Sequence, residues 1–361
     1  MEPNRYTLDG DAQVEGVVAA HQDIIARAVK ANVPTELFSA LVLLGGYGRA
    51  EGGYHHVNGE PEPYNDYDYF VVVRGMGRRA AKALQFSLAP LAEELSDKVG
   101  IEVDLAVLSE EQLAHAEYSL MNAEMRWGHR VIVGDAAILS QMPPMPVGNL
   151  PLAEFTRLML NRGSLLLMNQ QVLAQHDEQI SQVESERFFK YLFKAVLACG
   201  DALLAVAGNY VPSYPDKLLR LEKRQGERFM ALYRLAYEHK FHPDYSQFAR
   251  EDLRDWQLRV VDFWLDVLSI LEQVRTGRRV ESWEDYASPR YPKGQSVNKR
   301  LVYIIAVGLR DYGIASCLKR SGWTWRYPRE RLISSLPMLL LNPGQVASHE
   351  VSRCLLYTSD A

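Results

Sequence analysis

The chain has few cysteines and no long apolar run. Its 361 residues include only Cys199, Cys317 and Cys354, an odd number at wide spacing, so neither a disulfide framework nor a zinc site is indicated. No stretch approaches the roughly 18–20 apolar residues that span a bilayer, and the opening residues lack the basic segment and apolar run of a secretory signal. These absences predict a reduced, cytoplasmic protein without a membrane partner.

An excess of basic charge is also missing. The formal net charge of −5 argues against sequence-independent binding of extended nucleic acid, which requires many cationic contacts to phosphate. The apolar content of 47% is typical of a globular protein, and the length is sufficient for two domains with separate cores. A bound nucleotide would therefore have to be held locally, by a metal ion, lysine and backbone N–H groups.

The first 148 residues predict an α/β (α+β) domain with a small mixed sheet, because short apolar runs alternate with helical periodicity. Strands are expected at residues 41–44, 69–73, 101–108 and 130–135. Helices are expected at residues 14–31, from Pro34-Thr35, at 78–99 with Pro90 kinking or splitting the helix, and from Ser109.

A proline-rich linker at residues 143–151 separates this region from one with helical periodicity throughout. Residues 149–351 are therefore predicted to form an all-α antiparallel helical bundle. Residues 352–361 resemble translated sequencing-adapter read-through, so this tail is interpreted as non-native. Helices are expected at residues 152–176, 184–207, 217–239, 250–274, 299–318 and 329–341.

The strongest chemical signal is the order of features in the first domain. A Gly45-Gly46 turn ends an apolar strand, Asp66 and Asp68 enter the next strand, and Asp104 lies in a third. The carboxylates of Asp66 and Asp68 project from one strand face, roughly 6–7 Å apart along the chain. If the third strand pairs beside the second, Asp104 joins them.

Such a carboxylate set suits Mg²⁺, which takes hard oxygen ligands and combines one or two protein carboxylates with substrate phosphates. Three carboxylates, from Asp66, Asp68 and Asp104, could hold two Mg²⁺ ions, one for a triphosphate and one for an attacking hydroxyl. Gly45 and Gly46 would let backbone N–H groups approach the phosphates. The order of these features, rather than the Asp-x-Asp triplet alone, carries the prediction.

Arg49, just after the glycine turn, could add a charge-assisted contact to the triphosphate. Glu102 precedes Asp104 by two residues and so shares its strand face. A carboxylate at that place could act as general base on an acceptor hydroxyl. The alternative, that Glu102 is an ordinary edge residue, stays open.

Residues 41–108 resemble the DNA polymerase β-type nucleotidyltransferase superfamily, in its small-substrate, antibiotic-nucleotidyltransferase-like branch. The signature of that family is a Gly-Gly or Gly-Ser turn, an Asp-x-Asp pair and a distant aspartate. The resemblance implies that Gly45 and Gly46 bind phosphate. It also implies that the metal ligands are Asp66, Asp68 and Asp104.

Two features depart from the family pattern. Residues 47–65, between the turn and the Asp-x-Asp pair, are longer than usual and predict a hairpin-like insertion, and Gly46 stands where many members carry serine. In similar enzymes a basic residue from the second domain neutralises the triphosphate. Lys194, on a helix face, and Lys217, after a Ser-Tyr-Pro turn, are the candidates, each against the alternative of a solvated lysine.

The sequence thus predicts a metal-dependent nucleotidyltransferase. It would move a nucleoside monophosphate from a nucleoside triphosphate, with ATP favoured, to a hydroxyl of a small polar acceptor and release pyrophosphate. The chain is also compatible with a homo-oligomer. The alternatives are a non-catalytic nucleotide-binding regulator and an antitoxin-like nucleotidyltransferase that modifies a protein hydroxyl.

Overall fold

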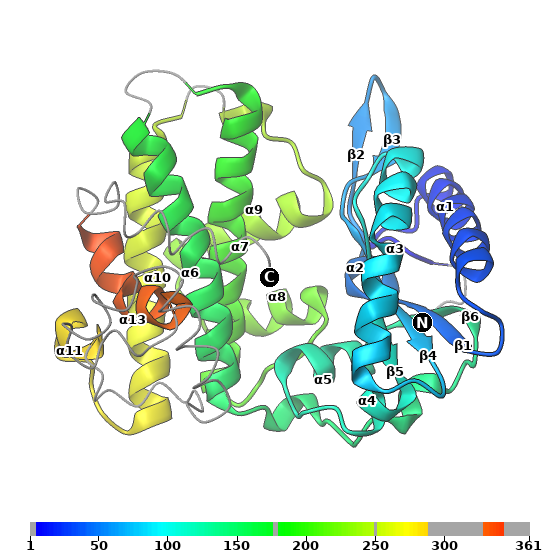
Figure 1. Cartoon of the computed structure of the whole chain (residues 1–361). Coiled ribbons are helices and arrows are strands. Elements are labelled where there is room, and N and C mark those ends of the chain that lie inside the picture. The colour runs from blue at the N-terminus through cyan, green and yellow to red at the C-terminus, as the bar shows by residue number, and fades with distance from the viewer. Residues whose placement is uncertain (1–4, 176–179, 249–250, 288–327, 343–361) are drawn as a thin grey trace, which may run out of the picture. The chain divides into compact units, whose positions relative to one another are not determined.

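The computed structural model of the chain describes residues 5–175, 180–248, 251–287 and 328–342, and it divides into two compact units (Figure 1). The predicted boundaries, 1–148 and 149–351, stay predictions. Lys217 belongs to the first unit, although the sequence analysis assigned it to the helical domain. Unit 1 comprises Met1–Leu150, Tyr210–Met230 and Tyr237–Asp244, and unit 2 comprises Pro151–Asn209, Ala231–Ala236 and Tyr245–Ala361.

Unit 1 contains a four-stranded sheet with the order β5-β4-β1-β6. Strand β1 runs antiparallel to both β4 and β6, whereas β4 and β5 are parallel. The parallel pair requires a crossover connection, which α3 (Arg78–Val99) supplies. The predicted small mixed sheet is therefore confirmed. Its strands are β1 (Phe38–Leu43), β4 (Tyr67–Val73), β5 (Val103–Ser109) and β6 (Arg130–Gly134).

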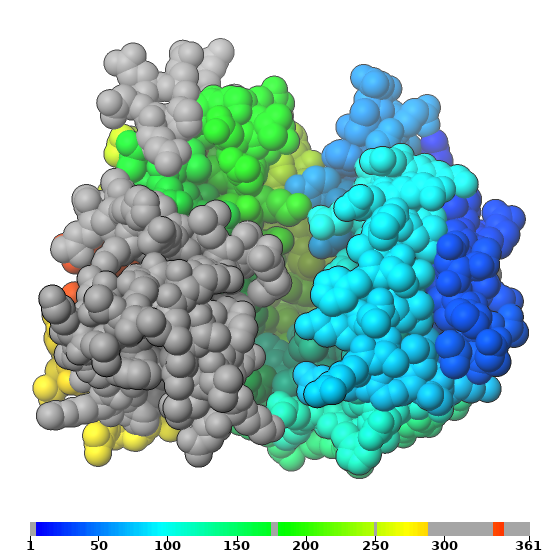
Figure 2. All heavy atoms as spheres, in the orientation of Figure 1, coloured from blue at the N-terminus to red at the C-terminus, as the bar shows by residue number. Residues whose placement is uncertain are grey.

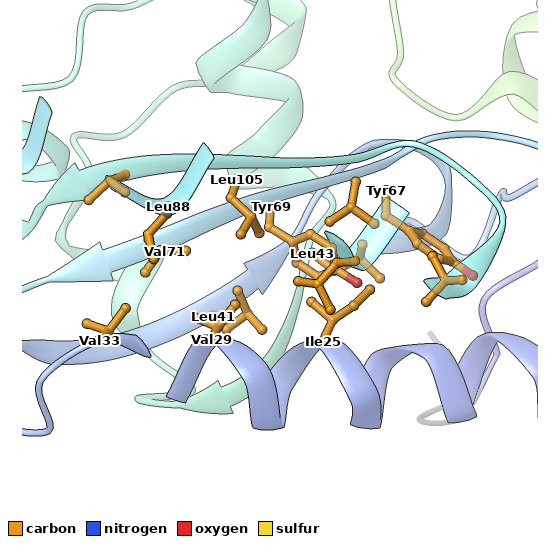
Figure 3. Packing of buried hydrophobic residues seen from close by; sticks show 14 of the residues in the cluster. Ile25, Val29, Val33, Leu41, Leu43, Tyr67, Tyr69, Val71, Leu88 and Leu105 are labelled. Carbon is orange, nitrogen blue, oxygen red and sulfur yellow. The ribbon is translucent and has the colours of Figure 1, made fainter. Parts of the chain in front are cut away.

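The core of unit 1 lies between this sheet and two helices, α1 (Ala12–Asn32) and α3. Figure 2 shows α1 and α3 side by side on the visible face of the unit. Apolar residues at helical spacing in α1, including Ile25 and Val29, pack against the sheet (Figure 3). The odd-numbered residues of β4 and β5 point into this core, among them Tyr69 and Leu105. Because strand side chains alternate, the even-numbered residues face the other side.

The predicted insertion at residues 47–65 contains a β-hairpin, which confirms that expectation. Strands β2 (Tyr54–Val57) and β3 (Glu60–Pro63) pair in antiparallel register. Asn58 and Gly59 connect them with backbone φ angles of 54° and 89°. Two consecutive left-handed residues of type Asn-Gly define a type I′ turn, whose twist matches that of the strands.

The remaining elements of unit 1 are short helices, and α9 contributes residues to both units. Ser109 caps α4 through a capping box with Gln112, as the Ser109 start signal predicted. These elements are α2 (Gly45–Gly48), α4 (Glu110–Ala114), α5 (Leu120–Trp127), η1 (Ile138–Gln141), η2 (Val147–Asn149), α8 (Tyr214–Glu222) and α9 (Glu227–Phe241).

Unit 2 is helical in its described residues, so the predicted class of an α/β domain followed by a helical region is confirmed. Trp264 is fully buried, and its indole N–H donates to the carbonyl of Met159 (3.0 Å). No helix in the described part of the chain combines the length and apolarity that crossing a bilayer requires. The elements are α6 (Leu152–Gln175), α7 (Gln182–Val206), η3 (Ser246–Phe248), α10 (Leu253–Thr276), α11 (Trp283–Ala287) and α13 (Pro328–Leu341).

Three expected helices differ from the structure. The helix expected from Pro34 is a single turn, in which the N–H groups of Leu37 and of Phe38, the first residue of β1, donate to the Pro34 carbonyl. The helix expected at 217–239 is two helices, because α8 ends at Glu222 and α9 begins after its N-cap, Gly226. The helix α3 remains one helix despite Pro90. The helix expected at 299–318 and the tail at 352–361 lie outside the described residues.

Candidate functional site

Two aspartates meet on the side of the sheet opposite the core. In the parallel register of β4 and β5, Asp68 lies directly beside Asp104. Neighbouring strands are about 4.8 Å apart, so the two carboxylates can reach a common ligand. Asp104 is exposed and Asp68 is partly exposed. The structure therefore brings together two members of the predicted triad.

Asp66 and Glu102 lie one residue before the paired strands begin. The Tyr67 N–H donates to the Glu102 carbonyl (2.8 Å), which aligns the two chain segments. Both Asp66 and Glu102 are exposed. Strand alternation assigns them to the same side of the sheet as Asp68 and Asp104.

The described residues contain no group of three or more His, Cys, Asp or Glu side chains that could hold a metal ion by themselves. The predicted three-carboxylate group is therefore not assembled among them, and the Asp68–Asp104 pair is what the strand register provides. Mg²⁺ usually takes one or two carboxylates from a protein when phosphates supply further oxygen ligands. The donor set thus fits a metal ion bound together with a nucleotide.

The glycine turn lies against Asp68. Gly45 has φ +62°, and a Cβ placed there would lie 2.9 Å from Asp68 Oδ2, so both the backbone conformation and the carboxylate require glycine. The Leu44 N–H also donates to the Asp68 carbonyl (2.8 Å). Gly45, Gly46 and Tyr47 open the one-turn helix α2, and the first N–H groups of a helix have no acceptor within it.

Arg49 follows α2 and faces carboxylates of the protein. Its side chain is only 10% exposed, and its Nε lies 3.5 Å from Glu51 Oε2. Burial lowers the pKa of Arg49, but the charges of Glu124 and Glu51 outweigh that effect and raise it. The Glu51 N–H in turn donates to the Gly46 carbonyl (2.8 Å). Arg49 thereby holds Glu51, and Glu51 holds the glycine turn through its hydrogen bond to Gly46.

Lys217 lies in the same unit, at the start of α8. The Ser213 side chain caps this helix by accepting from Asp216 N–H. The Lys217 side chain is 1% exposed, and its Nζ lies 3.8 Å from Glu124 Oε1. It also stands 4.3 Å from the centre of the Tyr214 ring, a cation–π contact.

A short chain of contacts joins Lys217 to the glycine turn. The Tyr214 N–H donates to Glu51 Oε1 (3.2 Å), and the Glu51 N–H donates to the Gly46 carbonyl. The Tyr210 hydroxyl donates to Glu124. Burial raises the pKa of Glu124, but Lys217, Arg49 and this hydrogen bond outweigh burial and hold its pKa below the ordinary value. Glu124 is therefore a carboxylate at neutral pH and a counter-charge for Lys217.

Lys194 lies on α7 in unit 2, partly buried. The other predicted site residues belong to unit 1, and the role of Lys194 stays a prediction.

The sequence analysis missed Glu51 and Glu124, because their partners are distant in the chain. Tyr47 was also missed, although an aromatic residue inside a glycine turn is a usable signal: it must either be buried or cover a ligand.

Comparison with known proteins adds little. No family model and no curated protein matches the chain. Among solved structures, the crystal structure of spectinomycin adenyltransferase AAD(9) from Enterococcus faecialis with ATP and spectinomycin is similar at 11% sequence identity and a TM-score of 0.42. The match covers 69% of this chain and 98% of that one. A likeness of this size carries no conclusion about the function of this chain.

Proposed function

We propose that this protein is a Mg²⁺-dependent nucleotidyltransferase that moves a nucleoside monophosphate from a nucleoside triphosphate to a hydroxyl of a small polar acceptor. The observation that carries the proposal is the pairing of Asp68 with Asp104 in adjacent parallel strands, with Asp68 in contact distance of the Gly45 turn. A carboxylate pair next to a helix start, whose first N–H groups have no acceptor within the helix, suits a metal-bound polyphosphate.

In the reaction, the acceptor oxygen forms a bond to the α-phosphorus as the bond from that phosphorus to the pyrophosphate oxygen breaks. Asp68 and Asp104 would hold the metal ion. A bound Mg²⁺ supplies neutralisation of charge on the phosphate oxygens. The Gly45, Gly46 and Tyr47 N–H groups would orient the phosphates, since positioning and charge stabilisation dominate phosphoryl-type transfers.

Glu102 would accept the proton of the acceptor hydroxyl. It is exposed one residue before β5 begins, two residues from Asp104, so an acceptor can reach it from solvent. Asp66, beside Glu102, would bind a metal ion or a metal-bound water. A second Mg²⁺ remains part of the proposal, with Asp66 as its additional ligand.

Lys217 would act on the phosphate turn indirectly, because it packs on Tyr214, whose N–H donates to Glu51, and the Glu51 N–H donates to the Gly46 carbonyl. Arg49 would act indirectly, by holding Glu51 in the position from which it hydrogen-bonds to Gly46. Lys194 remains a candidate for neutralising the triphosphate, and acceptor selection is the role proposed for the helical domain. The net charge of −5 favours a small acceptor over a polynucleotide.

The test is release of pyrophosphate from ATP, GTP, CTP and UTP with Mg²⁺ and a panel of acceptors, including aminoglycoside-like sugars, polyols and protein hydroxyls. With triphosphates labelled at the α-phosphorus, the proposal expects one acceptor class to become labelled. Asp68→Asn and Asp104→Asn should each abolish this transfer. Exposed Glu94→Gln, on α3, is the matched control and should retain full activity. Nucleotide binding without turnover across the whole panel would instead support a non-catalytic regulator.

A further inference from the structure

The hydroxyl of Tyr47 joins the glycine turn to the segment that carries Asp66. Tyr47 lies in α2 and is fully buried. Its hydroxyl donates to the Gly53 carbonyl (2.7 Å) and accepts from the N–H groups of Tyr64 (3.1 Å) and Asn65 (3.3 Å). Asn65 immediately precedes Asp66, so one side chain of the turn fixes the backbone entering the carboxylate site.

The surrounding chain is shaped to admit this side chain. A Cβ at Gly52 would lie 2.1 Å from Tyr47 Cδ1, so the ring occupies the space that any other residue at position 52 would need. Asn65 Oδ1 accepts from the Gly53 N–H (2.7 Å), which closes the base of the β2–β3 hairpin. Three backbone groups therefore contact the Tyr47 hydroxyl, and the Asn65 side chain adds a further hydrogen bond between the same segments.

The Tyr47 hydroxyl stays protonated under working conditions. Burial raises the pKa of Tyr47 above its ordinary value. It can therefore donate to the Gly53 carbonyl and accept from two N–H groups at every pH at which the protein would act. A phenylalanine would fill the same space but leave the Asn65 N–H without this acceptor.

We propose that Tyr47 is a positioning residue for Asp66: its hydroxyl holds the Asn65–Asp66 backbone in place relative to the glycine turn, so that Asp66 can serve the metal–nucleotide site. This inference rests on the proposed function for the metal, but the hold on the backbone is independent of it. Groups that orient metal ligands typically change metal affinity by 10–100-fold when they are removed.

The experiment compares Tyr47→Phe with Tyr69→Phe. Tyr69 is the matched control because it is equally buried, lies next to Asp68, and loses one hydroxyl hydrogen bond, to Gln22 Oε1 on α1 (2.6 Å). Two readouts are taken on the full chain: hydrogen exchange of the Asn65 amide, and the Mg²⁺ concentration that gives half-maximal pyrophosphate release. The maximal rate at saturating Mg²⁺ is recorded with the second.

Tyr47→Phe is expected to speed exchange of the Asn65 amide and to raise the half-saturating Mg²⁺ concentration by roughly tenfold, with the maximal rate largely retained. Tyr69→Phe should change neither value. Unchanged exchange in Tyr47→Phe, or equal Mg²⁺ requirements in the two variants, overturns the inference. Should wild-type protein release no pyrophosphate, the proposed function fails instead, and the exchange measurement still decides whether Tyr47 holds Asn65.

Discussion

Replacing Gly45 by alanine should damage activity far more than stability. The left-handed φ of +62° at Gly45 costs an alanine about 1–2 kcal/mol. The added Cβ would also lie 2.9 Å from Asp68 Oδ2, so the carboxylate must move by roughly 0.5 Å to reach ordinary van der Waals contact. A displacement of this order at a reacting centre lowers the rate on the order of tenfold to a hundredfold.

Gly75 provides the matched control. Its φ is +67°, but nothing lies within 4 Å of the Cβ that alanine would add, so Gly75→Ala carries the same backbone strain without touching Asp68. Denaturant unfolding should show similar losses for Gly45→Ala and Gly75→Ala, about 1–2 kcal/mol each. Pyrophosphate release should fall only in Gly45→Ala. Equal activity in the two variants would refute the assigned contact between turn and carboxylate.

Three further predictions concern stability. Gly163→Ala should destabilise unit 2 by about 1–3 kcal/mol in the unfolding assay, because the added Cβ would lie 2.4 Å from Trp264 Cζ2. Gly16 lies on an exposed part of α1 with open space around it, so Gly16→Ala should stabilise the protein by about 0.5–1 kcal/mol in the same assay. Because the folded pKa of Glu124 is lowered, its contribution is complete above the ordinary glutamate pKa and is lost as pH falls through the lowered value. The unfolding free energy of Glu124→Gln should therefore lie about 1–2 kcal/mol below that of wild type at pH 7, and the two values should converge in acid. The exposed control Glu94→Gln should match wild type at both pH values. A difference between wild type and Glu124→Gln that persists in acid would contradict the pairing of Glu124.

The local signals in the sequence were sufficient for the strands of the sheet, because continuous apolar runs marked β1, β4 and β5. Alternation assigned Asp68 and Asp104 to a shared face only on the condition that β5 pairs beside β4, and that strand order comes from the fold. Strand ends were less predictable: Asp68 lies inside β4 and Glu102 precedes β5. Ends depend on hydrogen bonds such as that from Tyr67 N–H to the Glu102 carbonyl, which no local pattern reveals.

The assignment of Lys217 to a unit could not be predicted, because it depends on tertiary contacts. The linker composition near residue 148 favoured a single boundary, yet Tyr210–Met230 belongs to unit 1. Burying Lys217 required a counter-charge, and Glu124 supplies it from α5. The residues that flank Lys217 in the sequence do not indicate Glu124 as its partner, nor do those that flank Glu124 indicate Lys217, so only the fold shows the pair.

The most direct test of the central claim is a double-mutant cycle on Asp68 and Asp104. Mn²⁺ affinity would be measured by electron paramagnetic resonance with a non-hydrolysable ATP analogue for wild type, Asp68→Asn, Asp104→Asn and the double variant. If both carboxylates bind one metal–nucleotide complex, the two losses are strongly non-additive, and the double variant binds Mn²⁺ little worse than either single variant. Independent, fully additive losses, or unchanged affinity in either single variant, would contradict a shared site.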